Sequence, residues 1–269
     1  MTLSCILLAL ILDAFFGEPN WLWSKLQHPA VTFGKIITWG EKKYNNGINR
    51  KGKGVIFLSV IVIFLATVGY IIEQLPFSAI WKILIVAILL SHKSLIEHVS
   101  AVSLGLQKDI DHGRKAVAMI VGRDTATLNE SDVARSAIES AAENFSDGII
   151  APLFWFFIGG LPGIIVYKFV NTADSMIGYK HPQLEQFGWA PAKLDDILNW
   201  IPARLSGLLI CIVYQNNSAF QTMRRDAKLH RSPNAGWPEA AMAGVLDIAI
   251  SGPRSYDGKE KIYPFVNPD

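Results

Sequence analysis

Long apolar blocks alternate with polar blocks along this chain. Residues 55–72 contain no charged side chain, and a helix needs about 20 apolar residues to cross the hydrocarbon core of a bilayer. A second block at 79–90 follows a tight connection through Pro76, so the two predict a helical hairpin. Further apolar segments lie at 2–16, 148–170 and 198–214, with a short one at 240–250. The pattern predicts an all-α, polytopic membrane protein that forms a single integral membrane domain over residues 1–269.

The segment between the hairpin and the next apolar block, residues 91–147, is charged, amphipathic and free of proline. We expect it to be helical, with breaks at Gly113 and Gly122 and a new helix capped by Thr127 or Asn129. Residues 148–170 are apolar but contain a Gly-Gly-Leu-Pro-Gly sequence at 159–163. Such a sequence predicts a kink or two half-helices, and broken backbone at membrane depth is tolerated where protein or water satisfies it.

Composition and charge agree with this interpretation. Hydrophobic residues make up 51% of the 269 residues, and charged residues 18%. The loop at 17–54 carries seven basic residues against two acidic ones, which the positive-inside rule places in the cytoplasm together with 91–147. We interpret this loop as a topology determinant that faces anionic membrane lipid, and we expect no nucleic-acid partner. Trp21, Trp23 and Trp39 are typical of interface anchors. We therefore expect a multi-pass protein of the cell (inner) membrane.

Acidic and amide side chains gather where apolar segments begin or end. Glu139, Glu143 and Asp147 recur every four residues, so on a helix their carboxylates share one face. Asn171 and Asp174 follow the next apolar block, and a third group consists of Asp195, Asp196 and Asn199. Mg²⁺ prefers one or two carboxylates together with phosphate oxygens. For any one of these runs alone, a solvated helix face is the simpler interpretation, whereas three runs at the same boundary favour a site.

The topology of this site has two solutions. If 148–170 crosses the membrane fully, residues 171–196 lie on the side opposite Glu143. If this segment re-enters, all acidic motifs face the cytoplasm and can share one site, which is the arrangement we favour.

Several other site types are excluded by the sequence. The histidines are widely separated, and Cys5 and Cys211 lie in apolar segments, so no zinc-binding spacing exists. No Gly-x-x-x-x-Gly-Lys-Ser/Thr loop is present, so a nucleotide would not bind through that cradle.

The motifs together resemble those of a known family. The residues that carry the resemblance are Glu139–Asn144 with Asp147-Gly148, Asn171–Lys180, Ala192–Arg204, Ser232–Glu239, and upstream Asp13–Pro19, His28-Pro29 and Gly122–Thr125. They are similar to the signatures of the adenosylcobinamide-phosphate synthase family, integral membrane proteins of cobalamin (vitamin B12) biosynthesis. The likeness runs in order over nearly the whole chain. Members usually continue beyond Pro264 into a final hydrophobic helix.

This resemblance implies an ATP-dependent ligase. Its corrinoid substrate, adenosylcobyric acid, would be joined through a propionate side chain to aminopropanol or its O-phosphate, giving adenosylcobinamide or its phosphate. The free carboxylate must become electrophilic, most simply as an acyl phosphate, while Mg²⁺ neutralises phosphate charge. The resemblance also implies membrane lipid as a neighbour and either a homo-oligomer or a complex with other cobalamin-assembly enzymes.

Residue roles follow from the matched motifs. The expected metal ligands are Glu139, Glu143, Asp147, Asp195 and Asp196. The expected catalytic residues are Glu143, Asp174 as base for the amine, and Arg123 and Arg204 as phosphate contacts. The expected substrate-binding residues are Asn144, Asn171, Tyr179, Lys180, Asn199, His230, Asn234 and Glu239.

Two other functions stay open at the level of sequence. A Mg²⁺-dependent membrane prenyl or phospho-alcohol transferase would use Asp195, Asp196 and Asn199 to hold a diphosphate, but the block at 232–239 has no evident task in it. A non-enzymatic membrane sensor or transporter would account for the broken helix at 159–163.

Overall fold

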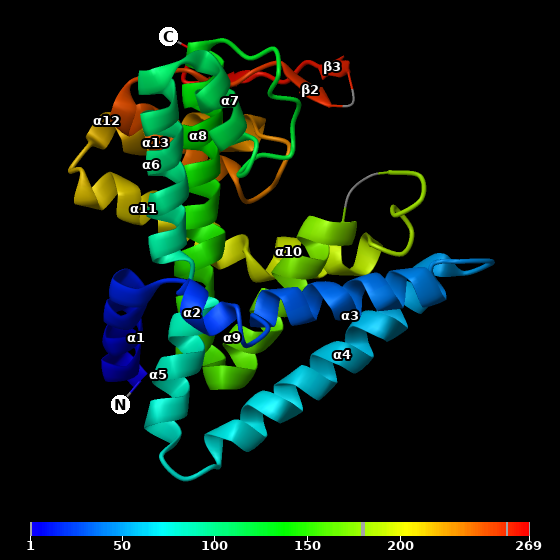
Figure 1. Cartoon of the computed structure of the whole chain (residues 1–269). Helices are drawn as coiled ribbons and strands as arrows, with labels where there is room; N and C mark the ends of the chain where they lie inside the picture. The colour runs from blue at the N-terminus through cyan, green and yellow to red at the C-terminus, as the bar shows by residue number, and fades with distance from the viewer. Residues whose placement is uncertain (1, 179–180, 257, 269) are drawn as a thin grey trace. The chain divides into compact units, whose positions relative to one another are not determined.

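The computed structural model describes residues 2–178, 181–256 and 258–268, which are mostly helical (Figure 1). The chain divides into two compact units. Unit 1 comprises Met1–Lys93 and Ala151–Asn199, and unit 2 comprises Ser94–Ile150 and Trp200–Asp269. The expectation of a single membrane domain stays a prediction.

Unit 1 contains the longest apolar helices. Its elements are α1 (Thr2–Phe16), α2 (Asn20–Trp23), α3 (Pro29–Tyr44), α4 (Arg50–Glu73), α5 (Ser78–Leu89), the first residues of α6 (His92–Lys108), α9 (Ala151–Ile177) and α10 (Trp189–Leu198). Figure 1 shows α4 and α5 joined by a short turn, which is the predicted hairpin. A Cβ atom at Gly69 of α4 would lie 2.7 Å from the nitrogen of Pro162, so glycine there lets α4 and α9 approach closely.

Three helical stretches of the described residues are long and apolar enough to cross a membrane. They are Arg50–Glu73, Ser78–Lys108 and Glu130–Ile177. The pair Trp189–Leu198 and Trp200–Val213, bent by 45°, makes a fourth if it counts as one span. The predicted all-α, polytopic membrane fold is therefore confirmed.

The predicted break in the 148–170 segment lies at Gly160. This residue has φ 60° and ψ −149° inside α9, a backbone conformation that is essentially restricted to glycine. The amide freed at Leu161 donates a hydrogen bond of 3.1 Å to Oε1 of Glu73, and the same oxygen is 3.2 Å from Nζ of Lys82. The hairpin α4–α5 thus caps the second half of α9. Whether this segment spans or re-enters stays a prediction.

A second long-range cap involves Asp13, the acidic residue near the end of α1. Its side chain is buried, and Oδ2 accepts hydrogen bonds from the backbone amides of His92 at 3.0 Å and Lys93 at 3.2 Å. These amides begin α6 and have no partner within that helix. A carboxylate that would be costly in an apolar segment therefore serves as a helix cap.

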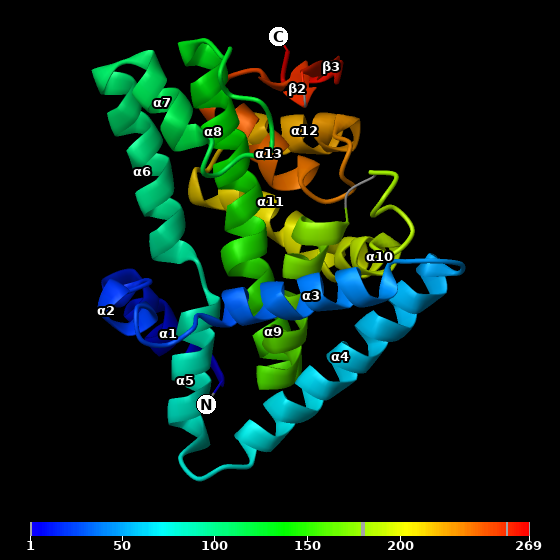
Figure 2. The ribbon, with the colours of Figure 1, turned by 45° about the vertical axis from the view of Figure 1, so that its right-hand side comes forward.

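Unit 2 packs around a short, small-residue helix. Its elements are the remainder of α6, α7 (Ile110–Val117), α8 (Glu130–Phe145), the π-helical turn η1 (Ser146–Ile150), α11 (Trp200–Val213), α12 (Asn217–Asp226), the 3₁₀ turn η2 (Ala227–Leu229) and α13 (Gly236–Leu246). Figure 2 shows α13 among α8, α11 and α12, and the alanines of α13 at 240, 241 and 243 are fully buried. Small side chains allow neighbouring helices to pack closely on α13.

The end of unit 2 forms two short antiparallel strand pairs. β1 (Ile250–Ser251) pairs with β4 (Phe265–Val266), and β2 (Arg254–Tyr256) pairs with β3 (Lys259–Lys261). The sequence pattern indicated only a polar end here. The apolar helix expected at 240–250 begins earlier, at Gly236, and ends at Leu246.

The polar segment 91–147 is helical as expected, but one predicted break was wrong. Gly113 lies inside α7, and the break falls at Asp109, whose Oδ1 accepts a hydrogen bond from the amide of His112 at 2.9 Å and so begins α7. A Cβ atom at Gly113 would lie 2.5 Å from the Leu106 side chain, so this glycine serves helix contact. The break near Gly122 is confirmed, and Asn129 caps α8.

Candidate active site

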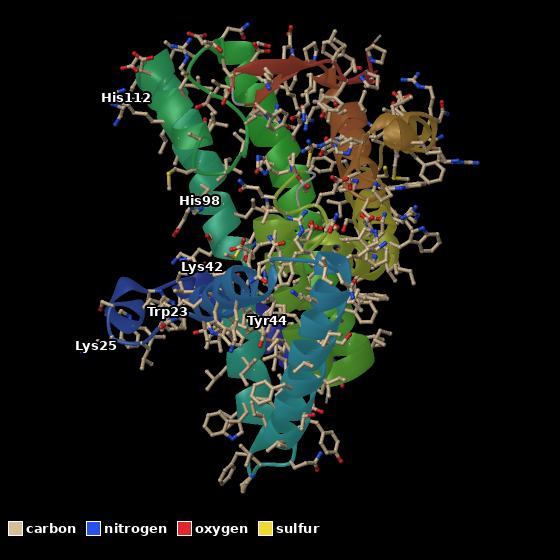
Figure 3. All side chains as sticks on the ribbon, turned by 90° about the vertical axis from the view of Figure 1, so that its right-hand side faces the viewer. Trp23, Lys25, Lys42, Tyr44, His98 and His112 are labelled. Atoms are coloured by element: carbon tan, nitrogen blue, oxygen red, sulfur yellow. The ribbon has the colours of Figure 1, made fainter. Side chains whose placement is uncertain are left out.

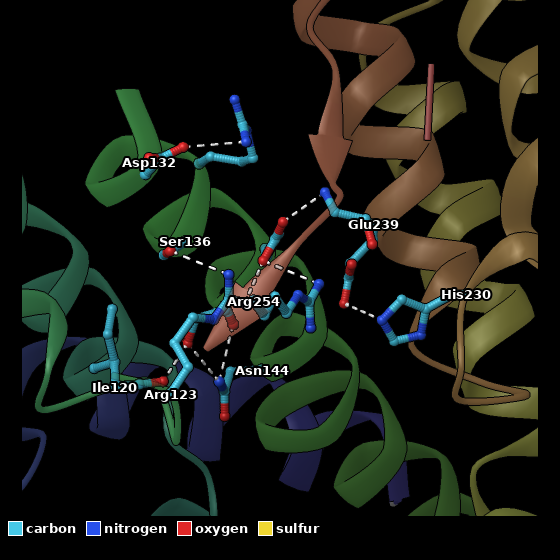
Figure 4. Close-up of polar contacts among 12 residues, drawn as sticks. Ile120, Arg123, Asp132, Ser136, Asn144, His230, Glu239 and Arg254 are labelled. Carbon is cyan, nitrogen blue, oxygen red and sulfur yellow. Dashed lines mark hydrogen bonds and ion pairs between the residues drawn. The ribbon is translucent and has the colours of Figure 1, made fainter. Parts of the chain in front are cut away.

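A buried ion cluster lies at the centre of unit 2. Glu139 of α8 is 2% exposed and ion-paired with Arg123 and, at 3.1 Å, with Nη2 of Arg254 (Figure 4). Its Oε1 also accepts a 2.6 Å hydrogen bond from the backbone amide of Ser251. Removing charges from water is costly, and here two cations and a backbone donor offset that cost for one carboxylate.

The two arginines come from separate segments that are tied together. Arg123 lies in the loop before α8 and also donates to Oγ of Ser136 at 3.2 Å. Its neighbour Asp124 accepts hydrogen bonds from Oγ of Ser255 at 2.8 Å and from the amide of Gly258 at 2.9 Å. These contacts fix the loop to the β2–β3 hairpin, which carries Arg254. The Gly-Arg-Asp-Thr motif therefore contributes twice to the cluster: Arg123 pairs with Glu139, and Asp124 holds the hairpin that carries Arg254.

His230 and Glu239 form a second buried polar pair in this unit. Their side chains are 5% and 1% exposed, and Nε2 of His230 lies 3.6 Å from Oε1 of Glu239 (Figure 4). Nδ1 of His230 accepts a hydrogen bond of 3.1 Å from the amide of Ser232. The neutral ring therefore carries its proton on Nε2, facing Glu239. Within the described part of the chain, Nε2 of His230 and Oε2 of Glu239 have no hydrogen-bond partner.

Burial and neighbouring charges set the protonation of this pair. Burial lowers the pKa of His230 to about 4, and the positive charges of Arg254 and Arg231 act in the same direction. Burial is the main reason that the pKa of Glu239 lies well above its usual value. Repulsion from Glu143 and Glu139 raises the pKa further, and attraction to Arg254 and Arg123 lowers it by less. The pair therefore favours a neutral imidazole and a protonated carboxyl group.

Arg254 stays charged beside this pair. Burial opposes the charge of its guanidinium group, but the attraction of acidic neighbours, Glu139 first, outweighs that effect and raises the pKa of Arg254. Its side chain is 5% exposed, and Nε has no hydrogen-bond partner among the described atoms.

Glu143 follows Glu139 by one turn of α8 and is exposed to solvent. Protein surrounds its carboxylate closely, and the charges of Arg231, Arg254, Glu139 and Arg123 all act on it, although part of the side chain reaches the surface. The neighbouring Asn144 donates from Nδ2 to the carbonyl oxygen of Ser140 at 2.9 Å, so its amide group folds back on α8. Glu143 is thus an accessible carboxylate beside buried, compensated charges.

Arg204 of α11 is held between two tryptophans of unit 2. Its guanidinium carbon lies 4.2 Å from the ring centroid of Trp200 and 4.6 Å from that of Trp237. Nη1 donates to the carbonyl oxygen of Trp200 at 2.6 Å and lies 3.4 Å from Oδ1 of Asn234. Stacking on aromatic faces and fixed donors preorganise a guanidinium group for an anion.

Unit 1 holds the other predicted group as a separate hydrogen-bond network. Asp195 of α10 accepts from Nδ2 of Asn171 at 3.2 Å and from Nδ2 of Asn199 at 3.0 Å. Oδ1 of Asn199 in turn accepts from the hydroxyl group of Tyr167 at 2.9 Å. Two motifs 24 residues apart are thus brought together through Asp195 and Asn171.

The remaining predicted residues are distributed as follows. Asp147 lies in η1 of unit 2, and π-helical turns are frequent at functional sites. Asp174 lies near the end of α9, where its carbonyl oxygen accepts a 2.7 Å hydrogen bond from the amide of Gly178. Asp196 is 3.1 Å from Nζ of Lys193. Tyr179 and Lys180 lie outside the described residues.

The described residues contain no group of three or more His, Cys, Asp or Glu side chains that could hold a metal ion. A cation at Glu139 would have to displace Arg123, Arg254 or Ser251 from its oxygens. Figure 3 shows His98 on α6 and His112 on α7 at separate places. The metal set Glu139, Glu143, Asp147, Asp195 and Asp196, and its sharing between units, stay predictions.

Sequence reasoning missed three participants. Arg254, Arg231 and the backbone amide of Ser251 all lie outside the quoted motifs. The only signal near Arg254 was the Gly-Pro pair before it, which predicts a turn but does not identify a charge partner.

Comparison with known proteins gives one consistent result. The sequence profile of the CobD/Cbib protein family matches residues 6–269. A protein of Brucella anthropi named "Cobalamin biosynthesis protein CobD" is 50% identical over 97% of this chain and 85% of its own length. Proteins with the same name from Rhizobium meliloti and Rhodobacter capsulatus are 45% and 44% identical, each over 97% of this chain and over 85% and 86% of their own lengths. No solved structure matches the chain. With a match along nearly its whole length, the chain belongs to the CobD/Cbib protein family.

Proposed function

We propose that this protein acts in cobalamin biosynthesis as an ATP-dependent ligase. In this reaction the free propionate carboxylate of adenosylcobyric acid is joined by an amide bond to aminopropanol or its O-phosphate. The names of the relatives support the pathway, and the motif resemblance supports the reaction. The inner membrane is the expected location.

One observation carries the proposal. Three motifs that are far apart in the sequence, at 122–125, 136–147 and 232–239, converge in unit 2 on one set of charged side chains (Figure 4). A ligase needs cations for phosphate groups and carboxyl groups that handle protons, in a site with little water. A purely structural cluster needs neither an accessible carboxylate such as Glu143 nor buried polar atoms without partners.

The roles divide according to what each side chain already contacts. Arg204 has no acidic partner among the described residues and is the better phosphate contact. Arg123 is already ion-paired with Glu139, so it would act on the negative charge of the phosphate groups only as part of that pair. Asp174 stays the proposed base for the amine, and His230, Asn234 and Glu239 the proposed substrate contacts.

ATP and Mg²⁺ are part of this proposal. Mg²⁺ that is bound mainly by phosphate oxygens needs only one or two protein carboxylates. Glu143 fits this requirement because it is exposed, whereas Glu139 does not, because its oxygens are already bound. When bound, the ion would neutralise phosphate charge and favour attack by the propionate carboxylate.

The direct test is turnover by the purified, full-length protein in detergent. We expect an amide product, detected by mass spectrometry, that requires adenosylcobyric acid, ATP, Mg²⁺ and the amine together. A requirement for a prenyl diphosphate would support the transferase instead, and the absence of turnover with either set would support a sensor or transporter.

Glu143→Gln is the matched variant, because it removes the charge and keeps the shape. We expect loss of turnover of at least about 100-fold, the lower range for removal of a catalytic acid–base or electrostatic group. Membrane insertion and the unfolding temperature should stay those of the unaltered protein. Retained activity would remove Glu143 from the site.

A further inference from the structure

The outer face of α3 in unit 1 combines apolar surface with basic side chains. The inner face of this helix is buried, with Phe33 and Ile37 in the core. Figures 1 and 2 both show α3 running across the directions of α5 and α9, which belong to two of the apolar stretches long enough to span a membrane. A helix that lies across the spans, with one face buried and the other apolar and basic, has the geometry of an interfacial helix.

A hollow of about 540 Å³ lies on this outer face. It is lined by Val31, Gly34, Lys35, Thr38, Trp39 and Lys42. Val31 and Trp39 are 51% and 50% exposed, although their side chains are apolar or aromatic. Gly34 lines the hollow without a side chain of its own, and a Cβ atom there would lie 3.4 Å from Sδ of Met176 in α9. The hollow therefore offers two apolar side chains together with two lysines, Lys35 and Lys42, which lie two turns of α3 apart on the same face.

The charge of this face is not balanced by neighbouring acids. Lys42 is exposed and has no acidic partner among the residues that the structure describes, and Lys35 contacts only the amide oxygen of Gln27, at 2.9 Å. Lys43 lies 4.9 Å above the ring of Trp39, which adds a third positive charge at the same face. Cations near an anionic membrane surface each add about 1 kcal/mol of attraction, or about five-fold in affinity.

We propose that this α3 face, defined by the six residues that line the hollow, binds an anionic phospholipid. An acyl chain would lie against Val31, Gly34 and Trp39, and the phosphate group would lie between Lys35 and Lys42. Charge complementarity selects an anionic headgroup over a zwitterionic one, and the apolar walls select a lipid over a soluble phosphate. This site is independent of the proposed ligase activity.

The test uses quenching of Trp39 fluorescence by brominated lipid in nanodiscs that contain the full-length protein. The contribution of Trp39 is the difference between the unaltered protein and Trp39→Phe. At equal mole fraction, brominated phosphatidylglycerol in a phosphatidylcholine bilayer should occupy the α3 face several-fold more than brominated phosphatidylcholine in a phosphatidylglycerol bilayer. The double variant Lys35→Gln, Lys42→Gln should lose most of this preference.

The matched control is Lys259→Gln, Lys261→Gln, which removes two exposed lysines of β3 and should keep the preference. Equal quenching by both lipids would overturn the proposal, as would no quenching by either, which would leave this face to a protein partner. Reversal of quenching by soluble glycerol phosphate would also overturn it, since the site would then bind free phosphate.

Discussion

Glu139 illustrates how single charges are managed in unit 2. Its carboxylate is buried with two arginines and a backbone amide, so each of its oxygens is bound (Figure 4). Because the carboxylate and both guanidinium groups are already out of water, the charges depend on one another. Replacing one of these side chains leaves the other charges buried without a partner. The free energy lost in this way is larger than the net stabilisation that the intact ion pair provides.

Glu139→Gln should therefore reduce the free energy of unfolding by about 3–5 kcal/mol, the cost of leaving a buried partner uncompensated. The control is Asp132→Asn, which breaks the 3.2 Å pair with Arg135 on the same helix, where the side chains are 34% and 24% exposed. A pair this accessible contributes about 0.2–1 kcal/mol. Denaturant unfolding in detergent would measure both variants, and equal small losses would contradict a central role for Glu139.

His230 gives a prediction about pH. Its pKa is about 4 in the folded protein and about 6.5 when exposed, so the unfolded chain binds the proton first as pH falls. The contribution of His230 to the stability of the folded state should therefore fall by roughly 3 kcal/mol between about pH 6.5 and about pH 4. Glu239 has the opposite effect. Its pKa is raised in the folded protein, so its contribution to stability is lost as the pH rises above the pKa that the carboxyl group has in the unfolded chain.

The variant His230→Asn tests the acid side of that profile. The asparagine Oδ1 can replace Nδ1 as acceptor for the amide of Ser232, so the local turn keeps its hydrogen bond. We expect the fall in unfolding temperature between pH 6.5 and pH 4 to become shallower. An unchanged slope would show that other groups govern the acid loss of stability.

At the scale of elements, the break in α9 depends on one glycine. A Cβ atom at Gly160 would lie 2.4 Å from Oε1 of Glu73, the oxygen that caps the second half of the helix, and the positive φ adds backbone strain. Gly160→Ala should destabilise the protein by about 1–3 kcal/mol. Gly159→Ala is the control, because nothing lies within 4 Å of its Cβ position, and it should be neutral or stabilising by up to about 1 kcal/mol. Similar losses in both would argue against a required break at Gly160.

The break in α9 also shows which features of the fold can be predicted from the sequence and which cannot. The Gly-Gly-Leu-Pro-Gly sequence predicts a break because glycine and proline act locally, but nothing in it identifies Glu73, 88 residues away, as the cap. Gly113 was misjudged for the same reason, since its role is contact with Leu106 on a neighbouring helix. Motif matching likewise found Glu139 and Arg123, whereas Arg254 reaches them only through the strand pairs of the folded chain.

At the scale of the whole molecule, the crossing of the membrane by α4 is the step on which the topology depends. The helix has 24 residues, which at 1.5 Å each gives about 36 Å, enough to cross a hydrocarbon core of about 30 Å. Its two ends carry exposed residues suited to labelling. Ile48, before α4, is 89% exposed, and Phe77, after it, is 79% exposed.

Single cysteines at these two positions should react with a membrane-impermeant thiol reagent from opposite sides. Cys5 and Cys211 are both buried, and replacing them by alanine gives a background without competing thiols. In intact cells, Phe77→Cys should be labelled, whereas Ile48→Cys should require permeabilisation, because the basic residues before α4 keep that end in the cytoplasm. Labelling of both from one side would mean that α4 does not cross. The basic segment 17–54, which contains α3, would then lose its role as topology determinant. The cytoplasmic assignment of 91–147, which follows from two crossings, would lose its basis.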